Sequence, residues 1–134
     1  MTQLLRKSNL NLKASSILIS NNIFDSSIHC AYYSTVQLML HLLRSEFKKS
    51  DSDVDSESEQ GSRNEKGFHN WLSNFFIKEL MKKDFMLTRD FNKFVTTLKS
   101  SRVKADYKNL EIKESVAKQN LDLAKQINQL LQEN

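Results

Sequence analysis

Apolar side chains recur at three- and four-residue steps in five stretches of this chain, which is the spacing of helices. The most apolar stretch is residues 25–47, which opens on an Asp-Ser-Ser sequence that can cap a helix. Its apolar positions cover more than one face, and a helix of that kind is buried on most sides. We therefore predict a central helix at 25–47 that serves the core of the monomer, or both that core and a subunit interface.

The same spacing predicts four further helices, at residues 8–20, 67–80, 87–104 and 114–132. A short turn after the first of them should lead directly into the central helix. In the first helix the side chains predicted to face inward are Leu10, Ala14, Ile17 and Leu18. In the second an aromatic-rich stripe is predicted to be core, formed by Phe68, Trp71, Leu72, Phe75, Phe76 and Leu80.

Residues 50–66 interrupt this pattern with a polar, Ser-rich and acidic segment whose only hydrophobic residue is Val54. A segment with so little to bury does not offset the entropy lost when its backbone is ordered. Its alternating acids resemble the start of a calcium-binding loop, but Ser56 and Ser62 stand where such a loop needs Gly and a bidentate Glu. We predict a mobile acidic loop at 50–66.

The chain has 134 residues, no Pro and only two Gly, so it lacks the turn residues that an all-β fold requires. We predict one all-α domain over residues 1–134, an antiparallel up-and-down bundle of four to five helices. Cys30 is the single cysteine, which excludes an internal disulfide. No apolar run has the length of a signal peptide or a membrane span, so we expect a soluble cytoplasmic protein without a membrane partner.

The net charge of +4 is unevenly distributed along the chain. Residues 50–65 carry six acids and one base, a local charge of −5, while the rest of the chain has 19 bases and 10 acids, or +9. A basic body of this kind suits an anionic partner such as nucleic acid or a nucleotide. The alternative is that the scattered lysines serve only solubility.

The residues that usually carry catalysis are few. The three histidines show no metal-binding spacing, and we expect His29 and His41 at the polar edge of the central helix. Cys30 lies inside that apolar helix, where a thiolate is disfavoured. No glycine-rich phosphate-binding motif is present. We therefore predict neither a metal site nor a cofactor.

Two short motifs remain, AYYS at 31–34 and SRVKADY at 101–107. Arg102 lies on or beside the apolar stripe of its helix, and Asp106, four residues later, is placed to pair with it. The order of motifs is an AYYS helix, a variable polar segment, a His69 to Phe75 element, an R-x-x-A-D-Y helix end and a final alanine-containing helix. In this order, residues 10–132 resemble the HEPN domain family, in particular its branch with the R-x-x-A-D-Y signature.

The resemblance implies an all-α up-and-down bundle that dimerises and associates with RNA or nucleotides. Many members of the family are toxins encoded beside a minimal nucleotidyltransferase partner that neutralises them. Its ribonuclease branch uses an Arg-x(4–6)-His motif, of which Arg102 matches the Arg while Tyr107 stands in the place of the His. A second match to that motif, from Arg63 to His69, lies at the end of the acidic segment and is a weak candidate.

The residues predicted to gather around the two motifs are Arg102, Asp106, Tyr107, Tyr33 and Tyr32. In one interpretation they form a binding site, in which Arg102 meets a phosphate and Tyr33 supplies a hydroxyl or a stacking face. In the other they are structural, with an Arg102–Asp106 ion pair and Tyr107 filling a gap between helices.

Three functional hypotheses follow from the sequence. The first is a HEPN-like homodimer without strong catalysis, part of a toxin–antitoxin or stress and defence module, that binds a nucleotide, RNA or a nucleotidyltransferase. The second is a metal-independent ribonuclease toxin. The third is a structural dimerisation module.

Overall fold

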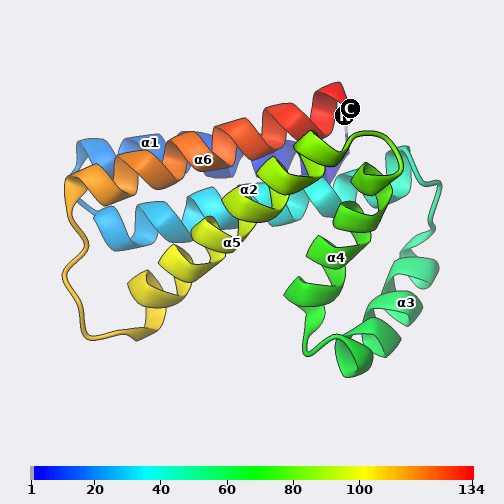
Figure 1. Ribbon diagram of the computed structural model, residues 1–134. Helices are drawn as coiled ribbons and strands as arrows, with labels where there is room; N and C mark the ends of the chain where they lie inside the picture. Colours follow the sequence, from blue (N-terminus) through cyan, green and yellow to red (C-terminus); the bar gives the residue numbers. More distant parts are fainter. Residues whose placement is uncertain (1) are drawn as a thin grey trace.

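The computed structural model describes residues 2–134, and that part of the chain is all-helical (Figure 1). It contains six helices where five were predicted: α1 (Gln3–Ser20), α2 (Phe24–Ser45), α3 (Asp51–Asn64), α4 (Phe68–Met81), α5 (Phe85–Tyr107) and α6 (Glu114–Glu133). The predicted all-α class is confirmed. Within residues 2–134, none of these helices combines the length and the apolar character that crossing a bilayer requires.

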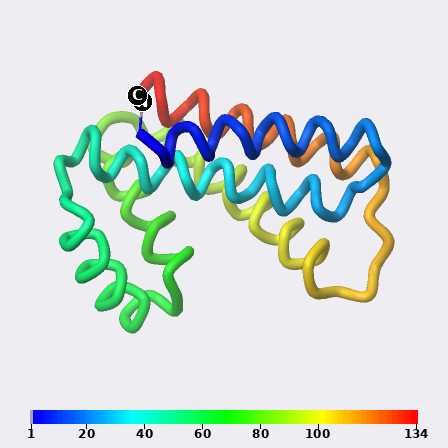
Figure 2. Tube along the Cα trace, turned by 180° about the vertical axis from the view of Figure 1, so that it is seen from behind, coloured from blue at the N-terminus to red at the C-terminus, as the bar shows by residue number. Residues whose placement is uncertain are grey.

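Helix α2 is central to this arrangement. It contacts α1, α4, α5 and α6, and in Figures 1 and 2 it runs through the middle of the molecule. Ile28, Leu38 and Leu43 on different faces of α2 are fully or almost fully buried. The central-helix prediction agrees with this burial. Because neighbours in the same chain already cover these faces, α2 needs no second subunit to bury them.

Helix α1 meets α2 through serines instead of the predicted leucine and isoleucine. Ser8 and Ser15 are buried, and their hydroxyl groups donate to main-chain carbonyl oxygens of α2 at 2.7 and 2.8 Å. Leu10 and Ile17 are 49% and 51% exposed, so their predicted inward orientation is wrong. The physical reason is size: small side chains with satisfied hydroxyl groups let the two helices approach closely, which turns Leu10 and Ile17 outward.

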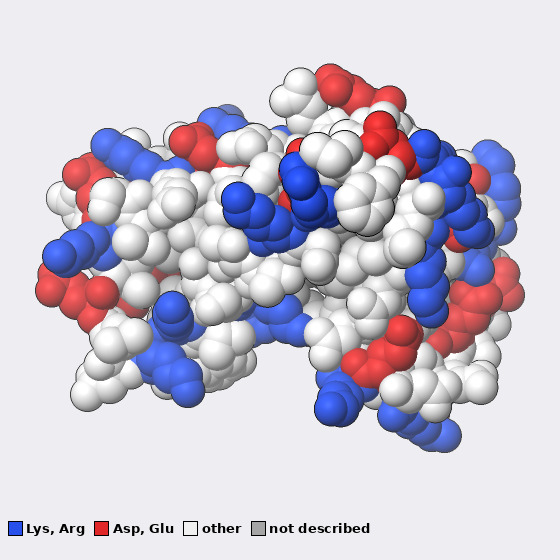
Figure 3. All heavy atoms as spheres, in the orientation of Figure 1, with Lys and Arg blue, Asp and Glu red and all other residues white. Residues whose placement is uncertain are grey.

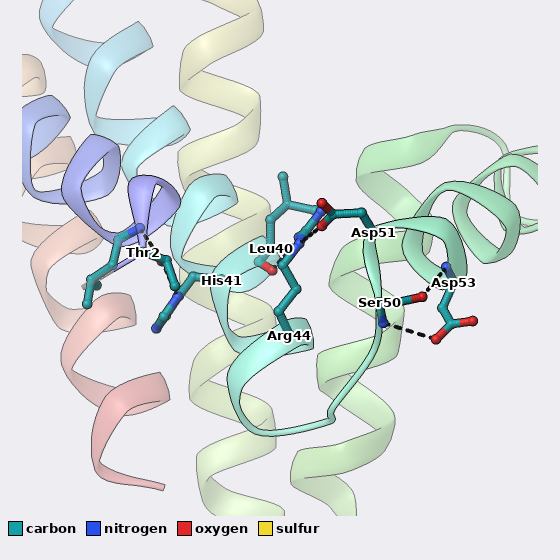
Figure 4. A network of polar contacts seen from close by, with 8 residues as sticks. Thr2, Leu40, His41, Arg44, Ser50, Asp51 and Asp53 are labelled. Atoms are coloured by element: carbon teal, nitrogen blue, oxygen red, sulfur yellow. Dashed lines mark hydrogen bonds and ion pairs between the residues drawn. The ribbon is translucent and has the colours of Figure 1, made fainter.

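The predicted acidic loop is a helix instead. Helix α3 begins with a capping box, in which the Asp53 main-chain N–H donates to Ser50 Oγ and the Ser50 N–H donates to Asp53 Oδ2, both at 3.0 Å (Figure 4). The Ser50 main-chain N–H lowers the pKa of Asp53, which keeps this carboxylate charged at the positive end of the helix dipole. Arg44 of α2 pairs with Asp51 and ties the start of α3 to the body.

Helix α3 lies against α4, away from α1 and α6 (Figures 1 and 2). Two of its residues are buried, Val54 and Gly61. A Cβ atom at Gly61 would lie 1.9 Å from Trp71 Cδ1, so only glycine permits this approach of α3 to the indole ring. Two buried positions and a cap therefore order a segment whose composition predicted a loop.

The aromatic core predicted for the helix at 67–80 is confirmed in α4. Trp71, Leu72, Phe76 and Leu80 are buried, and Phe68 and Phe75 are partly buried against them. Helix α5 crosses this layer and buries Phe91, Val95 and Leu98. The C-terminal end of α5 and the N-terminal end of α4 both reach the first half of α2, where Arg102 and His69 each contact Tyr32.

Candidate functional site

Polar and aromatic side chains from three helices converge where the end of α5, the start of α4 and the first half of α2 meet. We call this group the Arg102 cluster; it consists of Arg102, Asp106 and Tyr107 from α5, His29, Tyr32 and Tyr33 from α2, and His69 from α4. All five residues of the predicted site belong to it. The fold thus brings together two motifs that lie about seventy residues apart in the chain.

Arg102 lies at the centre of the cluster and is only 8% exposed. Its Nη1 atom is 3.6 Å from Asp106 Oδ2, so the predicted ion pair is present. Its guanidinium carbon lies 5.0 Å from the centre of the Tyr32 ring and 5.8 Å from the centres of both the Tyr33 and Tyr107 rings. The electron-rich faces of these rings favour a cation at this distance.

The hydrogen bonding of Arg102 is incomplete. Its Nε atom is buried and has no hydrogen-bond partner within the described part of the chain. Burial alone would lower the pKa of this guanidinium, but the acidic groups around it, Tyr33, Tyr32 and Asp106, outweigh burial and raise the pKa. Arg102 is therefore a permanent buried cation with a donor to spare, and a buried N–H without a partner costs free energy.

Asp106 is shared between Arg102 and His29. Its Oδ2 atom accepts a hydrogen bond from His29 Nδ1 at 2.9 Å in addition to facing Arg102. The His29 ring also lies 4.7 Å from the centre of the Tyr33 ring. His29 was predicted only as a polar-edge residue. Its three-residue spacing from Tyr32 and four-residue spacing from Tyr33 place the three side chains on one helical face, and this signal was present in the sequence.

His69 is the residue that α4 contributes to the cluster. Its Nδ1 atom is 2.7 Å from the hydroxyl oxygen of Tyr32. Burial lowers the pKa of His69, and the charges of Arg102 and Lys99 lower it further. Burial raises the pKa of Tyr32 to about 12, against the effect of Arg102. The phenol therefore stays protonated and donates to a neutral imidazole, which leaves the imidazole proton on Nε2.

The structure separates the two residues of the weak Arg63 to His69 match. His69 joins the Arg102 cluster. Arg63 lies on α3, where its Nη2 atom donates to Glu59 Oε1 at 2.9 Å and both side chains are largely exposed. The two residues therefore do not act as one motif, and only the histidine half of the match belongs to the site.

Tyr107 does not have the structural role that the sequence allowed for it. Its side chain is 74% exposed, so it fills no gap between helices, and that prediction is wrong. The reason is that Tyr107 is the last residue of α5, two residues beyond Ala105, which still packs against the core. One face of the ring lies towards Arg102 and the rest is open to a ligand.

A groove of about 460 Å³ lies between α4 and α5 and adjoins the cluster through Lys99. Lys99 Nζ donates to Asn70 Oδ1, and Asn70 follows His69 on α4. Burial lowers the pKa of Lys99, and the charge of Arg102 lowers it further. Figure 3 shows the surface hollowed in this region, with Lys and Arg side chains along the hollow. Lys99 was not singled out in the sequence.

The remaining reactive groups lie apart from any metal-binding arrangement. Within residues 2–134, no three His, Cys, Asp or Glu side chains are grouped so that they could hold a metal ion. Burial raises the pKa of the Cys30 thiol, which keeps it protonated and a poor nucleophile. The chemistry available at the site is therefore cation–anion binding, aromatic stacking and proton transfer through imidazole.

Comparisons with protein-family models, with curated proteins and with solved structures find no match for this chain.

Proposed function

We propose that the Arg102 cluster binds the phosphate group of a nucleotide or of RNA. The observation that carries this proposal is the Arg102 guanidinium, which is buried and permanently charged and has an Nε–H donor without a partner. A phosphate oxygen is the acceptor that a guanidinium binds most strongly, because both are charged and their geometries match.

The surroundings of Arg102 support an anionic and aromatic ligand. Asp106 is the only carboxylate in the cluster, while Arg102, Lys99 and two histidines supply donors. Tyr33 and the exposed ring of Tyr107 offer faces on which a base can stack. A site with more donors than acceptors and with open aromatic faces suits a nucleotide unit better than a neutral metabolite.

The resemblance to HEPN domains extends the proposal. On this basis the proposal also includes an antiparallel up-and-down arrangement of the helices, homodimerisation and a cytoplasmic location. It further places the protein in a toxin–antitoxin or defence module with a minimal nucleotidyltransferase partner. The exposed Leu10 and Ile17 on α1 offer an apolar surface to a second subunit. Sedimentation at micromolar concentration tests the dimer, and a monomer would remove that part of the proposal.

The direct test is binding of AMP and of a fluorescein-labelled single-stranded RNA to Arg102→Gln, measured by calorimetry and by fluorescence anisotropy. Loss of charge-assisted hydrogen bonds should weaken binding by roughly tenfold to a hundredfold. Arg63→Gln, which removes an exposed arginine on α3, is the matched control and should bind as wild type does. Absence of binding by the wild type, or equal losses in both variants, would contradict the proposal.

A second candidate function is metal-independent RNA cleavage, and one observation favours it. The place of the family's catalytic histidine is taken by Tyr107, but two imidazoles reach the cluster from other helices. The Tyr33 ring lies between them, with its centre 4.7 Å from the His29 ring and 5.9 Å from the His69 ring. Attack of a ribose 2′-hydroxyl on the adjacent phosphate needs a base for that proton and an acid for the leaving 5′-oxygen.

In this reaction the Tyr32 hydroxyl would take the 2′-hydroxyl proton while passing its own proton to Nδ1 of neutral His69. His29 beside Asp106 would protonate the leaving oxygen, and Arg102 would stabilise the charge that develops on the phosphate. The products are a 2′,3′-cyclic phosphate and a free 5′-hydroxyl. Incubation of RNA with the protein and EDTA tests this candidate. His69→Gln should lose cleavage while retaining RNA binding, and an inactive wild type would contradict it.

A further inference from the structure

We infer that the groove between α4 and α5 binds single-stranded RNA continuing from the phosphate at Arg102. The inference rests on the proposed function and deepens it, since it names a strand of several nucleotides as the ligand instead of a mononucleotide. It is carried by the position of the groove beside the cluster, by its charge and by the chemistry of its walls.

The groove is continuous with the Arg102 cluster. Each residue of a helix turns by about 100°, so Lys99 lies between Arg102 on one side and Val103 on the other around the axis of α5. Arg102 belongs to the cluster, and Val103 lines the groove. On α4, His69 belongs to the cluster and the next residue, Asn70, lines the groove. The Lys99–Asn70 hydrogen bond connects α5 to α4 at this point. A strand bound at Arg102 therefore meets the groove at Lys99.

The charge of the groove is positive. Lys99, Lys104 and Lys108 line it, and none of its lining residues in the described part of the chain is acidic. The hydrogen-bond partner of Lys99 is the neutral amide of Asn70. Burial lowers the pKa of Lys99, and the nearby charge of Arg102 lowers it further, since the two cations lie close together. A polyanion relieves this repulsion and releases its own counterions.

The walls of the groove suit bases as well as phosphates. Its apolar lining residues are Ile77 from α4 and Val95 and Val103 from α5. Side-chain amides from both helices also line it. Asn70 is hydrogen-bonded to Lys99 and to the main-chain oxygen of Lys66, and Asn74 donates to Glu65 Oε1, while Asn92 can donate to and accept from a base edge. A single strand of RNA can use these features together, since its phosphates meet the lysines and its bases meet the amide and the apolar residues.

The length of the groove exceeds one nucleotide. Its lining positions on α5 extend from Asn92 to Lys104, which at 1.5 Å per residue is roughly 18 Å of helix, and Lys108 lines the groove directly after the helix ends. Tyr107, exposed beside Lys108, provides a stacking face at the end of this path. A positive groove that follows the backbone, together with aromatic stacking, is the general way in which proteins hold single strands.

The test is the double variant Lys104→Gln/Lys108→Gln, compared with Lys7→Gln/Lys13→Gln on α1. Helix α1 contacts α2 and α6, so the second pair removes the same charge far from the groove. The probes are AMP and a labelled single-stranded RNA of about 12 nucleotides, titrated at several salt concentrations. All four lysines are exposed, and circular dichroism verifies that both variants fold.

The groove variant should bind the RNA roughly tenfold more weakly and should lose about 1.4 from the slope of log affinity against log salt, since each contact to a single strand contributes about 0.7. Its affinity for AMP should be unchanged. Equal behaviour of the two double variants, with binding still lost in Arg102→Gln, would overturn the groove and keep the proposed function. Tighter binding of a polyglutamate peptide than of the RNA would overturn it in favour of an acidic partner. RNA binding that is indifferent to Arg102→Gln would instead contradict the proposed function.

Discussion

Two polar groups flank α2 on different sides, and their chemistry is opposite. Between α2 and α6, Asn128 Oδ1 accepts from the Thr35 hydroxyl at 3.0 Å, and Asn128 Nδ2 donates to Ser34 Oγ at 2.8 Å. This Asn128 network is neutral and buried, and both ends of its amide are bonded. The Arg102 cluster is charged and aromatic, opens to solvent at Tyr107 and His29, and contains a buried donor without a partner.

The difference separates a structural role from a functional one. A fully satisfied neutral network stabilises one arrangement of helices and offers nothing to a ligand. Ser27 Oγ and Asn120 Oδ1 are also buried without a partner, but both are neutral. Arg102 differs because it is a buried cation with an unused donor, which costs more free energy. The same core helix therefore carries a structural network on one side and a candidate site on the other.

The largest effect is expected from Asn128→Ala. The change leaves the buried Thr35 and Ser34 hydroxyl groups without their partner and opens a small cavity, so the free energy of unfolding should fall by about 2–4 kcal/mol. Urea denaturation measures it. RNA binding per folded molecule should stay unchanged. Arg102→Gln should show the reverse pattern, with a smaller loss of stability and a large loss of RNA binding. If both variants lose stability and binding to the same extent, the Asn128 network and the Arg102 cluster do not differ in role.

A smaller effect is expected from Tyr107→Ala. Because this ring is exposed and makes no core contact, the free energy of unfolding should change by less than about 0.5 kcal/mol. RNA affinity should fall by about fivefold to tenfold, since stacking of a base on an aromatic ring contributes about 1–3 kcal/mol. Tyr107→Phe keeps the ring and should bind as wild type does. A similar loss in the Phe variant would assign the effect to the hydroxyl group and not to stacking.

The smallest effect is a change in pH dependence caused by His69. Its pKa is lowered in the folded state, so protonation favours the unfolded chain. The stability that His69 contributes is complete above the ordinary His pKa of about 6.5 and is lost as pH falls through the lower folded value. The melting temperature should therefore fall less steeply between pH 7.5 and 5.5 in His69→Gln than in the wild type.

His41→Gln controls for the removal of an imidazole elsewhere on α2. His41 hydrogen bonds Thr2 and lies outside the Arg102 cluster (Figure 4). Identical pH profiles for wild type and His69→Gln would mean that His69 is not held neutral beside Arg102. In that case the tautomer assigned to His69, and its role as a base in the second candidate function, would be withdrawn.

Much of the helical framework is determined by local sequence. The helix predicted at 114–132 is observed as Glu114–Glu133, and the central helix predicted at 25–47 is observed as Phe24–Ser45. Apolar periodicity and the absence of Pro set these elements, because both act within a few residues. The aromatic core of α4 and the Arg102–Asp106 pair follow from the same three- and four-residue spacing.

Other features depended on contacts between distant segments. Helix α3 is ordered by Val54 and by a glycine that fits one indole ring, and no pattern within the acidic segment reveals that partner. Leu10 and Ile17 point outward because serines of α1 find carbonyl groups on α2. Periodicity reports which residues share a face, but not which neighbour that face will meet.

For the candidate site, the local pattern places Arg102, Asp106 and Tyr107 at or just after the end of one helix and Tyr32 and Tyr33 on another. Only packing between helices brings His29, His69 and Lys99 close to the same guanidinium and leaves its Nε atom without a partner. The physical reason is that the environment of a buried charge is set by every helix packed around it, and those helices come together only when the chain folds.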